Sequence, residues 1–213
     1  MMGTNNASMM YENPNFIIDL DDKKTFYRLI GSCAVDLLLE KKAALMAHHC
    51  CRGFGLDYMT HGIKKLSISK QIAFIKMHLE SRGFEQNQIK IFEQNLKQYH
   101  TSFQASGREG KICFCLNKNL FLIDDGCNSF FKYFGGEAMY RPFEGKGSCE
   151  ILDALSQIGE PLVITFPSTF SALASFEQDN VVNYINDQKH YCQGSIAVPV
   201  LPNEIISIKR FNN

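Results

Sequence analysis

The sequence has no tryptophan and no excess charge of either sign. Its 213 residues carry 22 lysines and arginines against 22 aspartates and glutamates, so the formal net charge is zero. Nucleic-acid-binding proteins depend on an excess of positive charge, so this balance predicts no nucleic-acid partner. The apolar stretches are too short to cross a bilayer, and Met1 to Asn6 lack the basic start and apolar segment of a secretion signal. We therefore expect a soluble, cytoplasmic protein with no membrane partner.

Several motifs that carry familiar chemistry are also missing. No glycine-rich phosphate loop of the Walker or Rossmann type occurs, since Gly53-Phe54-Gly55 lacks the later glycine. The eight cysteines lie mostly inside apolar or strand-like runs, which favours reduced thiols over a disulfide framework. The run His48-His49-Cys50-Cys51 offers four donors that zinc favours, but neighbouring residues of a strand point to opposite faces. We therefore expect no metal.

The composition that remains is that of an ordinary globular domain. Hydrophobic residues make up 45% and charged residues 21% of the chain, enough to bury a substantial core. Residues 1–15 are polar, rich in asparagine and interrupted by Pro14, which predicts a flexible N-terminal tail. We expect a single domain over residues 16–213.

Hydrophobic periodicity predicts helices mostly in the first half of the chain and strands mostly in the second. The predicted helices cover about 22–41, 54–61, 69–83, 85–99, 148–158 and 176–187. The predicted strands cover 43–51, 111–116, 161–166, 194–200 and 204–211, and residues 117–128 are expected to be irregular. The helices at 69–83 and 85–99 are expected to form a hairpin packed on a sheet. This order is typical of an α+β domain with a central, mainly antiparallel sheet and helices in the N-terminal half.

The candidate site is organised around Gly135-Gly136-Glu137. Two adjacent glycines allow backbone conformations closed to other residues or a close approach to a ligand, and the carboxylate directly after them is then aimed at one point. An ordinary tight turn gives the same pattern. His49 and Arg52 leave the end of the strand predicted at 43–51, and we expect them to face Glu137 across a cleft.

Such a cleft suits a small nucleotide ligand. Arg52 would bind phosphate, His49 would donate to a ribose hydroxyl, and Glu137 would orient a hydroxyl or stabilise positive charge on the sugar. Tyr58, Tyr133 or Tyr140 would stack on a planar ring.

Two other interpretations are open. In one, His49, Arg52 and Glu137 form a structural network in a non-enzymatic interaction domain. In the other, Cys51 is the nucleophile of a Cys-dependent hydrolase.

These segments resemble an uncharacterised bacterial family that carries an HxCR segment, here His49 to Arg52, and a GGEAxY segment, here Gly135 to Tyr140. The layout is similar to the ADP-ribosyltransferase-like fold, with the corner His61-Gly62-Ile63, the strand ending Phe114-Cys115-Leu116, and late strands near Pro202 to Ile206. The resemblance implies NAD as substrate, ADP-ribosyl transfer to a protein target, catalytic roles for His49, Arg52 and Glu137, and NAD contacts from His49, Arg52, Tyr58, Gly135, Gly136 and Tyr140. The chain departs from the transferase pattern at Gly194-Ser195-Ile196, where those enzymes usually carry their catalytic glutamate.

Overall fold

A computed structural model of the chain describes residues 16–22, 34–40, 42–101, 107–118, 120–123, 125–145, 149–186 and 192–212. The tail expected at residues 1–15 lies outside the described residues. So does most of the helix expected at 22–41, of which the structure describes α2 (Ala34–Leu39).

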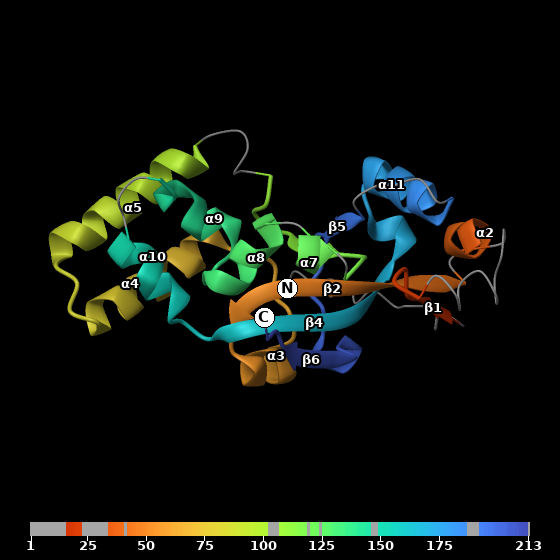
Figure 1. The fold of residues 1–213 in the computed structure, drawn as a ribbon, viewed down its shortest axis with the longest axis horizontal. Helices are drawn as coiled ribbons and strands as arrows, with labels where there is room; N and C mark the ends of the chain where they lie inside the picture. Colours follow the sequence, from red (N-terminus) through yellow and green to blue (C-terminus); the bar gives the residue numbers. More distant parts are fainter. Residues whose placement is uncertain are drawn as a thin grey trace, which may run out of the picture.

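The centre of the molecule is a six-stranded sheet in which only β1 runs parallel to its neighbour (Figure 1). The strands follow the order β5-β3-β2-β4-β6, and β1 pairs with β2 off this path. Their bounds are β1 Phe16–Ile18, β2 Ala43–Gly53, β3 Ile112–Cys115, β4 Glu160–Thr169, β5 Gln193–Ile196 and β6 Ser207–Arg210. The predicted mainly antiparallel sheet is confirmed.

The two long strands β2 and β4 lie at the centre of this sheet. Their antiparallel pairing runs without interruption from Ala44↔Thr169 to Gly53↔Glu160. Ala44, Leu45 and Ala47 are fully buried, as expected for a central strand that is covered on both faces. β2 continues two residues beyond the predicted strand at 43–51 because Arg52 and Gly53 still have partners on β4.

Each face of the sheet carries its own apolar cluster. One face buries alternate residues of several strands, including Leu45, Phe114 and Phe166, and the rings of Phe114 and Phe166 meet edge to face at 5.4 Å. The other face is covered by α7 (Leu120–Ile123) and α8 (Asp125–Lys132), which bring Phe121 and Phe131 against Cys115 of β3. The alternation of side chains along β2 therefore decides which cluster each of its residues joins.

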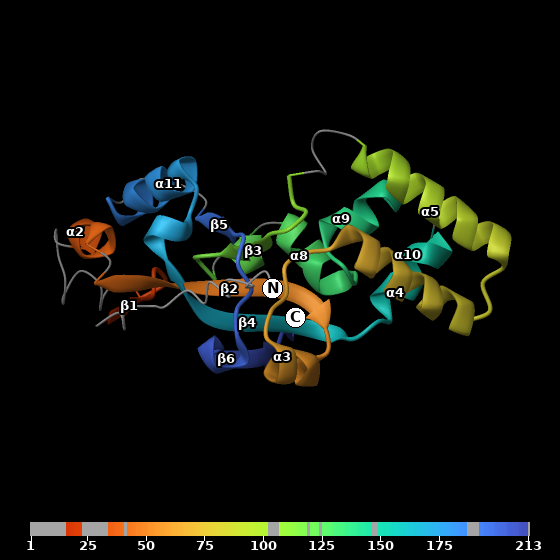
Figure 2. The ribbon, with the colours of Figure 1, turned by 180° about the vertical axis from the view of Figure 1, so that it is seen from behind.

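A third apolar cluster lies among helices at one end of the sheet (Figures 1 and 2). Its buried members include Ile75 and Leu79 of α4 (Ile68–Ser81), Phe92 of α5 (Gln86–His100), Met139 of α9 (Glu137–Tyr140) and Leu155 of α10 (Cys149–Ser156). The helical pair expected to pack on the sheet is thus confirmed as a pair, but its apolar face packs on other helices. The ring of Phe92 stacks on Phe143, which lies in the 3-10 turn Arg141–Phe143.

The remaining helices lie at the far end and the lower edge of the sheet in Figure 1. α11 (Ser175–Ile185) and α2 lie together at the end opposite α4 and α5, and α3 (Gly55–His61) lies beside β6 (Figures 1 and 2). Helices therefore occur in both halves of the described chain, and the two expected at 148–158 and 176–187 are present as α10 and α11. Within the described ranges, no helix combines the length and apolar character that a membrane crossing requires.

The segment 117–128 is also not irregular as expected, because it contains α7 and the first part of α8. Leu120, Phe121 and Phe131 of these helices are buried on the face of the sheet that α7 and α8 cover, and Asp124 of the predicted turn lies outside the described residues. β5 and β6 are shorter than the strands expected at 194–200 and 204–211, and a 3-10 turn at Pro202–Glu204 lies between them.

Candidate functional site

His49 and Arg52 both lie on β2, but they project from opposite faces of the sheet. They are three positions apart in a regularly paired strand, and side chains alternate between faces with a period of two. His49 Nδ1 donates to the carbonyl oxygen of Cys113 at 2.8 Å, and burial lowers its pKa despite this hydrogen bond. The sheet therefore separates the imidazole and the guanidinium that were expected to share a cleft.

Arg52 lies on the face covered by α8, at the end of the sheet. One terminal nitrogen donates to the carbonyl oxygen of Phe131 at 3.2 Å. Its Nε is buried and has no hydrogen-bond partner within the described part of the chain. Burial and the nearby Arg210 lower the pKa of Arg52, and Glu160 acts in the opposite direction. Arg52 thus retains a donor that the described residues leave unused.

Glu137 is engaged by two arginines. It begins α9, directly after Gly135 and Gly136, whose φ angles of 80° and 66° confirm the predicted need for glycine. Its carboxylate pairs with Arg108, and its other oxygen lies 3.9 Å from Nε of Arg141 one turn later. The pair with Arg108 ties α9 to the segment before β3, and the pair with Arg141 lies within one helical turn.

The tyrosines expected to contact a cofactor are packed against protein. Tyr140 is 1% exposed and packs against Tyr133 with ring centroids 5.3 Å apart, and burial raises its pKa to about 12. Tyr58 lies beside Cys51, whose thiol donates to the tyrosine hydroxyl at 3.4 Å. Burial raises the pKa of Cys51 to about 12, which keeps the thiol protonated at neutral pH and gives a Cys51 nucleophile no support.

A groove of about 490 Å³ lies at the Arg52 end of the sheet. It adjoins Arg52 in two ways, since Pro161 is the cross-strand partner of Arg52 and Phe131 accepts its hydrogen bond. The rings of Phe131 and Phe211 stack in the groove wall at 4.0 Å with an angle of 8° between planes. The groove is lined by Asn128, Ser129, Phe131, Lys132, Pro161 and Phe211.

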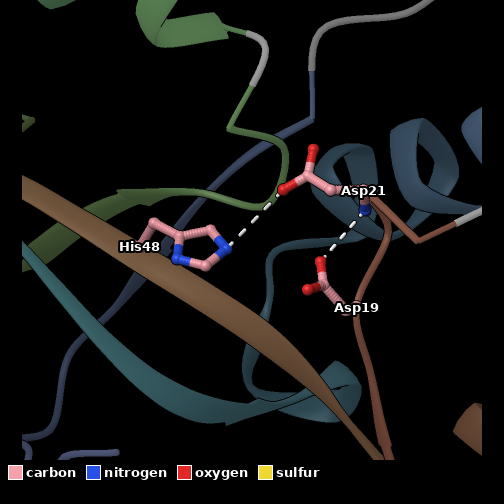
Figure 3. A group of neighbouring side chains, drawn as sticks. All are labelled: Asp19, Asp21 and His48. Atoms are coloured by element: carbon pink, nitrogen blue, oxygen red, sulfur yellow. Dashed lines mark hydrogen bonds and ion pairs between the residues drawn. The ribbon is translucent and has the colours of Figure 1, made fainter. Parts of the chain in front are cut away.

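A second polar group lies further along the same face of the sheet, around His48 (Figure 3). His48 is fully buried, and Figure 3 shows its ring pointing toward the carboxylates of Asp19 and Asp21. His48 Nε2 lies 3.9 Å from an Asp21 oxygen, and one ligand atom from each of the three residues lies within 4.8 Å of the others. On the other side of the ring, Nδ1 lies 3.1 Å from the hydroxyl of Thr165, its cross-strand partner.

The two aspartates are held in place by backbone contacts and by Lys118. The amide of Asp21 donates to Asp19 at 3.0 Å, and the amide of Lys118 donates to both carboxylate oxygens of Asp21 at 2.9 Å. The ammonium of Lys118 lies 3.5 Å from Asp19 and 4.0 Å from Asp21. Burial lowers the pKa of His48 to about 4, with Lys118 acting in the same direction and Asp19 against it, so the imidazole is neutral at pH 7.

Sequence reasoning missed this group because it assigned the aspartates at 21 and 22 to the start of a helix. The apolar run Phe16–Ile18 is instead a strand, and a turn follows it in which the amide of Asp22 donates to the carbonyl oxygen of Asp19 at 3.1 Å. Leu20 is buried in the main cluster, while the carboxylates of Asp19 and Asp21 lie near His48.

No protein-family model, curated protein or solved structure matches this chain. The resemblance to a bacterial family and to the ADP-ribosyltransferase-like fold therefore stays a prediction.

Proposed function

We propose that the protein binds a nucleotide, NAD or a relative of it, in the groove between α8 and the Arg52 end of the sheet. The observation that carries the proposal is a groove that presents Lys132 and the Phe131–Phe211 pair, next to Arg52, whose buried Nε has no hydrogen-bond partner among the described residues. The volume of the groove is within the range of small-molecule sites.

The two cationic side chains suit the phosphate part of such a ligand. A guanidinium offers donors in a planar fork that matches phosphate oxygens, and an ammonium adds a compact charge. Lys132 is exposed on the groove wall, with its ammonium 5.0 Å from the ring centroid of Tyr133. Arg52 would contribute the donor that its bond to Phe131 leaves available.

The aromatic pair suits the base. Phe211, which is partly exposed and stacks on the buried ring of Phe131, offers an apolar ring surface, and offset stacking on such a surface contributes about 0.5–1.5 kcal/mol beyond area burial. Asn128 and Ser129 supply amide and hydroxyl groups at the same wall for hydrogen bonds to the base or the ribose.

The other residues expected in the site are proposed to act structurally. His49 is bonded to Cys113 on the far face of the sheet, and the Glu137 carboxylate is paired with two arginines. At the strand where the resembled transferases carry their acid, Ser195 donates to Glu177 at 3.0 Å, but Glu177 also accepts from the amide of Ala174 as a helix cap. We therefore propose nucleotide binding without assigning a transfer step to any of these carboxylates.

Calorimetric titration with NAD and with ADP-ribose tests the proposal. Wild-type protein is expected to bind at one site, and Arg52→Gln and Lys132→Gln are each expected to weaken binding roughly tenfold, the value of one charge-assisted hydrogen bond. Lys90→Gln, which removes an exposed lysine from α5, is the matched control and is expected to leave the affinity unchanged. Absence of binding at millimolar nucleotide, or equal affinity in all three variants, would contradict the proposal.

A nicotinamide-release assay on the same proteins separates binding from turnover. Release by wild-type protein that disappears in Glu137→Gln would restore the catalytic role expected from the sequence. Binding without release supports the structural role of Glu137.

A further inference from the structure

We infer that Asp19, Asp21 and His48 form a binding site for a divalent metal cation that accepts one imidazole nitrogen and two carboxylate oxygens, such as Mn²⁺ or Zn²⁺. Figure 3 shows the three side chains. The site lies on the sheet face that carries α7, where the ring of His48 meets Phe121, and none of its residues lines the groove at Arg52. It rests on an observation independent of the proposed nucleotide site.

The carboxylates alone would not carry this inference, since exposed acidic pairs are common. The deciding feature is the imidazole, which is 0% exposed and whose Nε2 has no hydrogen-bond partner among the described residues. A buried polar atom without a partner destabilises the folded state, so its position needs a physical explanation. A cation held between this nitrogen and the two carboxylates would provide that partner.

The remaining contacts of His48 suit a metal ligand. Its Nδ1 lies 3.1 Å from the Thr165 hydroxyl, which can accept a hydrogen bond from Nδ1–H; the tautomer protonated at Nδ1 has its lone pair on Nε2. Metal-bound histidines usually donate their second ring nitrogen to such an oxygen, which fixes both tautomer and ring orientation. The edge-to-face contact with Phe121 at 6.1 Å further restricts rotation of the ring.

The distances require only a small contraction. Donors around a cation with bonds of about 2.1 Å lie about 3.0–3.5 Å apart. His48 Nε2 and the Asp21 oxygen are 3.9 Å apart, and all three ligand atoms lie within 4.8 Å of one another. Asp19 and Asp21 side chains are 26% and 16% exposed, so a cation can enter from solvent while the imidazole closes the site from within.

Lys118 is the main competitor for the carboxylates. Its ammonium lies 3.5 Å from Asp19, yet its side chain is 48% exposed and can turn to solvent when a cation enters. Its backbone amide, which positions the Asp21 carboxylate, does not depend on the side chain. Removal of the ammonium should therefore strengthen cation binding while keeping the geometry.

Calorimetric titration with Mn²⁺ after chelator treatment tests the inference. Mn²⁺ is the probe because cysteine thiolates, which bind Zn²⁺, are poor ligands for it. Wild-type protein is expected to bind one Mn²⁺. Asp19→Asn and Asp21→Asn are each expected to weaken binding at least roughly tenfold. Asp22→Asn is the matched control and is expected to change the affinity less than about threefold. Lys118→Met is expected to strengthen binding at least roughly fivefold, since a like charge about 4 Å away opposes the cation.

A second measurement needs no variant that could fail to fold. In wild-type protein, paramagnetic broadening by sub-stoichiometric Mn²⁺ is expected at the amide signals of Leu20, Asp21 and Lys118, but not at that of Phe92 in the helical cluster. Broadening centred elsewhere, no binding at millimolar Mn²⁺, or unchanged affinity in both aspartate variants would overturn the inference.

Discussion

The substitution Glu137→Gln tests the structural role that the contacts assign to this carboxylate. The change keeps the size of the side chain and removes the charge that pairs with Arg108 and Arg141. The Glu137 side chain is 23% exposed and that of Arg108 35%, so this pair is partly screened and is worth at most about 1 kcal/mol. The pair with Arg141, one helical turn away, adds about 0.3 kcal/mol.

We therefore expect Glu137→Gln to lower the free energy of unfolding by about 1 kcal/mol. For a chain of this length, such a loss lowers Tm by about 2–4 °C, which differential scanning calorimetry resolves. The affinity for NAD is expected to stay within about twofold of wild type, because Glu137 does not line the groove. The single variant Arg108→Gln and the double variant with Glu137→Gln complete a double-mutant cycle. This cycle isolates the interaction free energy between Arg108 and Glu137.

Glu144→Gln is the matched control. It removes a more exposed carboxylate that lies 3.4 Å from the same Arg141, and we expect less than about 0.5 kcal/mol of destabilisation. An unchanged Tm in Glu137→Gln together with a tenfold or greater loss of NAD affinity would refute this reasoning and return Glu137 to the binding site.

Three further predictions concern packing and thiol chemistry. Gly62→Ala is expected to lower the free energy of unfolding by more than about 2 kcal/mol, because φ is +70° and the added Cβ would collide with the Val200 carbonyl. Gly83→Ala, at φ +81° in open space, is expected to lower it by about 1 kcal/mol. Urea unfolding measures both values. Phe92→Ala, which empties the centre of the helical cluster, is expected to cost about 3–5 kcal/mol by the same measurement, and a cost below about 1 kcal/mol would contradict that packing. Burial raises the pKa of Cys51 to about 12, so we expect its thiol to react with iodoacetamide at pH 7.5 far more slowly than that of exposed Cys149. Peptide mass spectrometry measures both rates, and equal rates would contradict the burial of Cys51.

Elements whose apolar residues follow a single period were predictable from the sequence. β2, α3 and α5 occur within two residues of their expected bounds, because period and flanking glycines agree there. The segment 117–128 was not predictable in this way, since its helices are stabilised by contacts between Phe121, Phe131 and the sheet. Tertiary packing of this kind overrides local propensity.

The candidate site was predictable only in part. The glycine conformations before Glu137 followed from the residue types, but the arginine partners of Glu137 come from distant positions in the chain or from the next helical turn. The separation of His49 from Arg52 could have been predicted, because residues three positions apart in a strand point to opposite faces of the sheet. The group around His48 also depends on the pairing of β1 beside β2, which no local pattern specifies.

A crystal structure of the protein with bound ADP-ribose tests the central claim most directly. We expect the diphosphate within hydrogen-bonding distance of Arg52 and Lys132 and the adenine against the Phe131–Phe211 pair. Ligand density on the His49 face of the sheet, or beside Glu137 with the groove at Arg52 unfilled, would contradict the account.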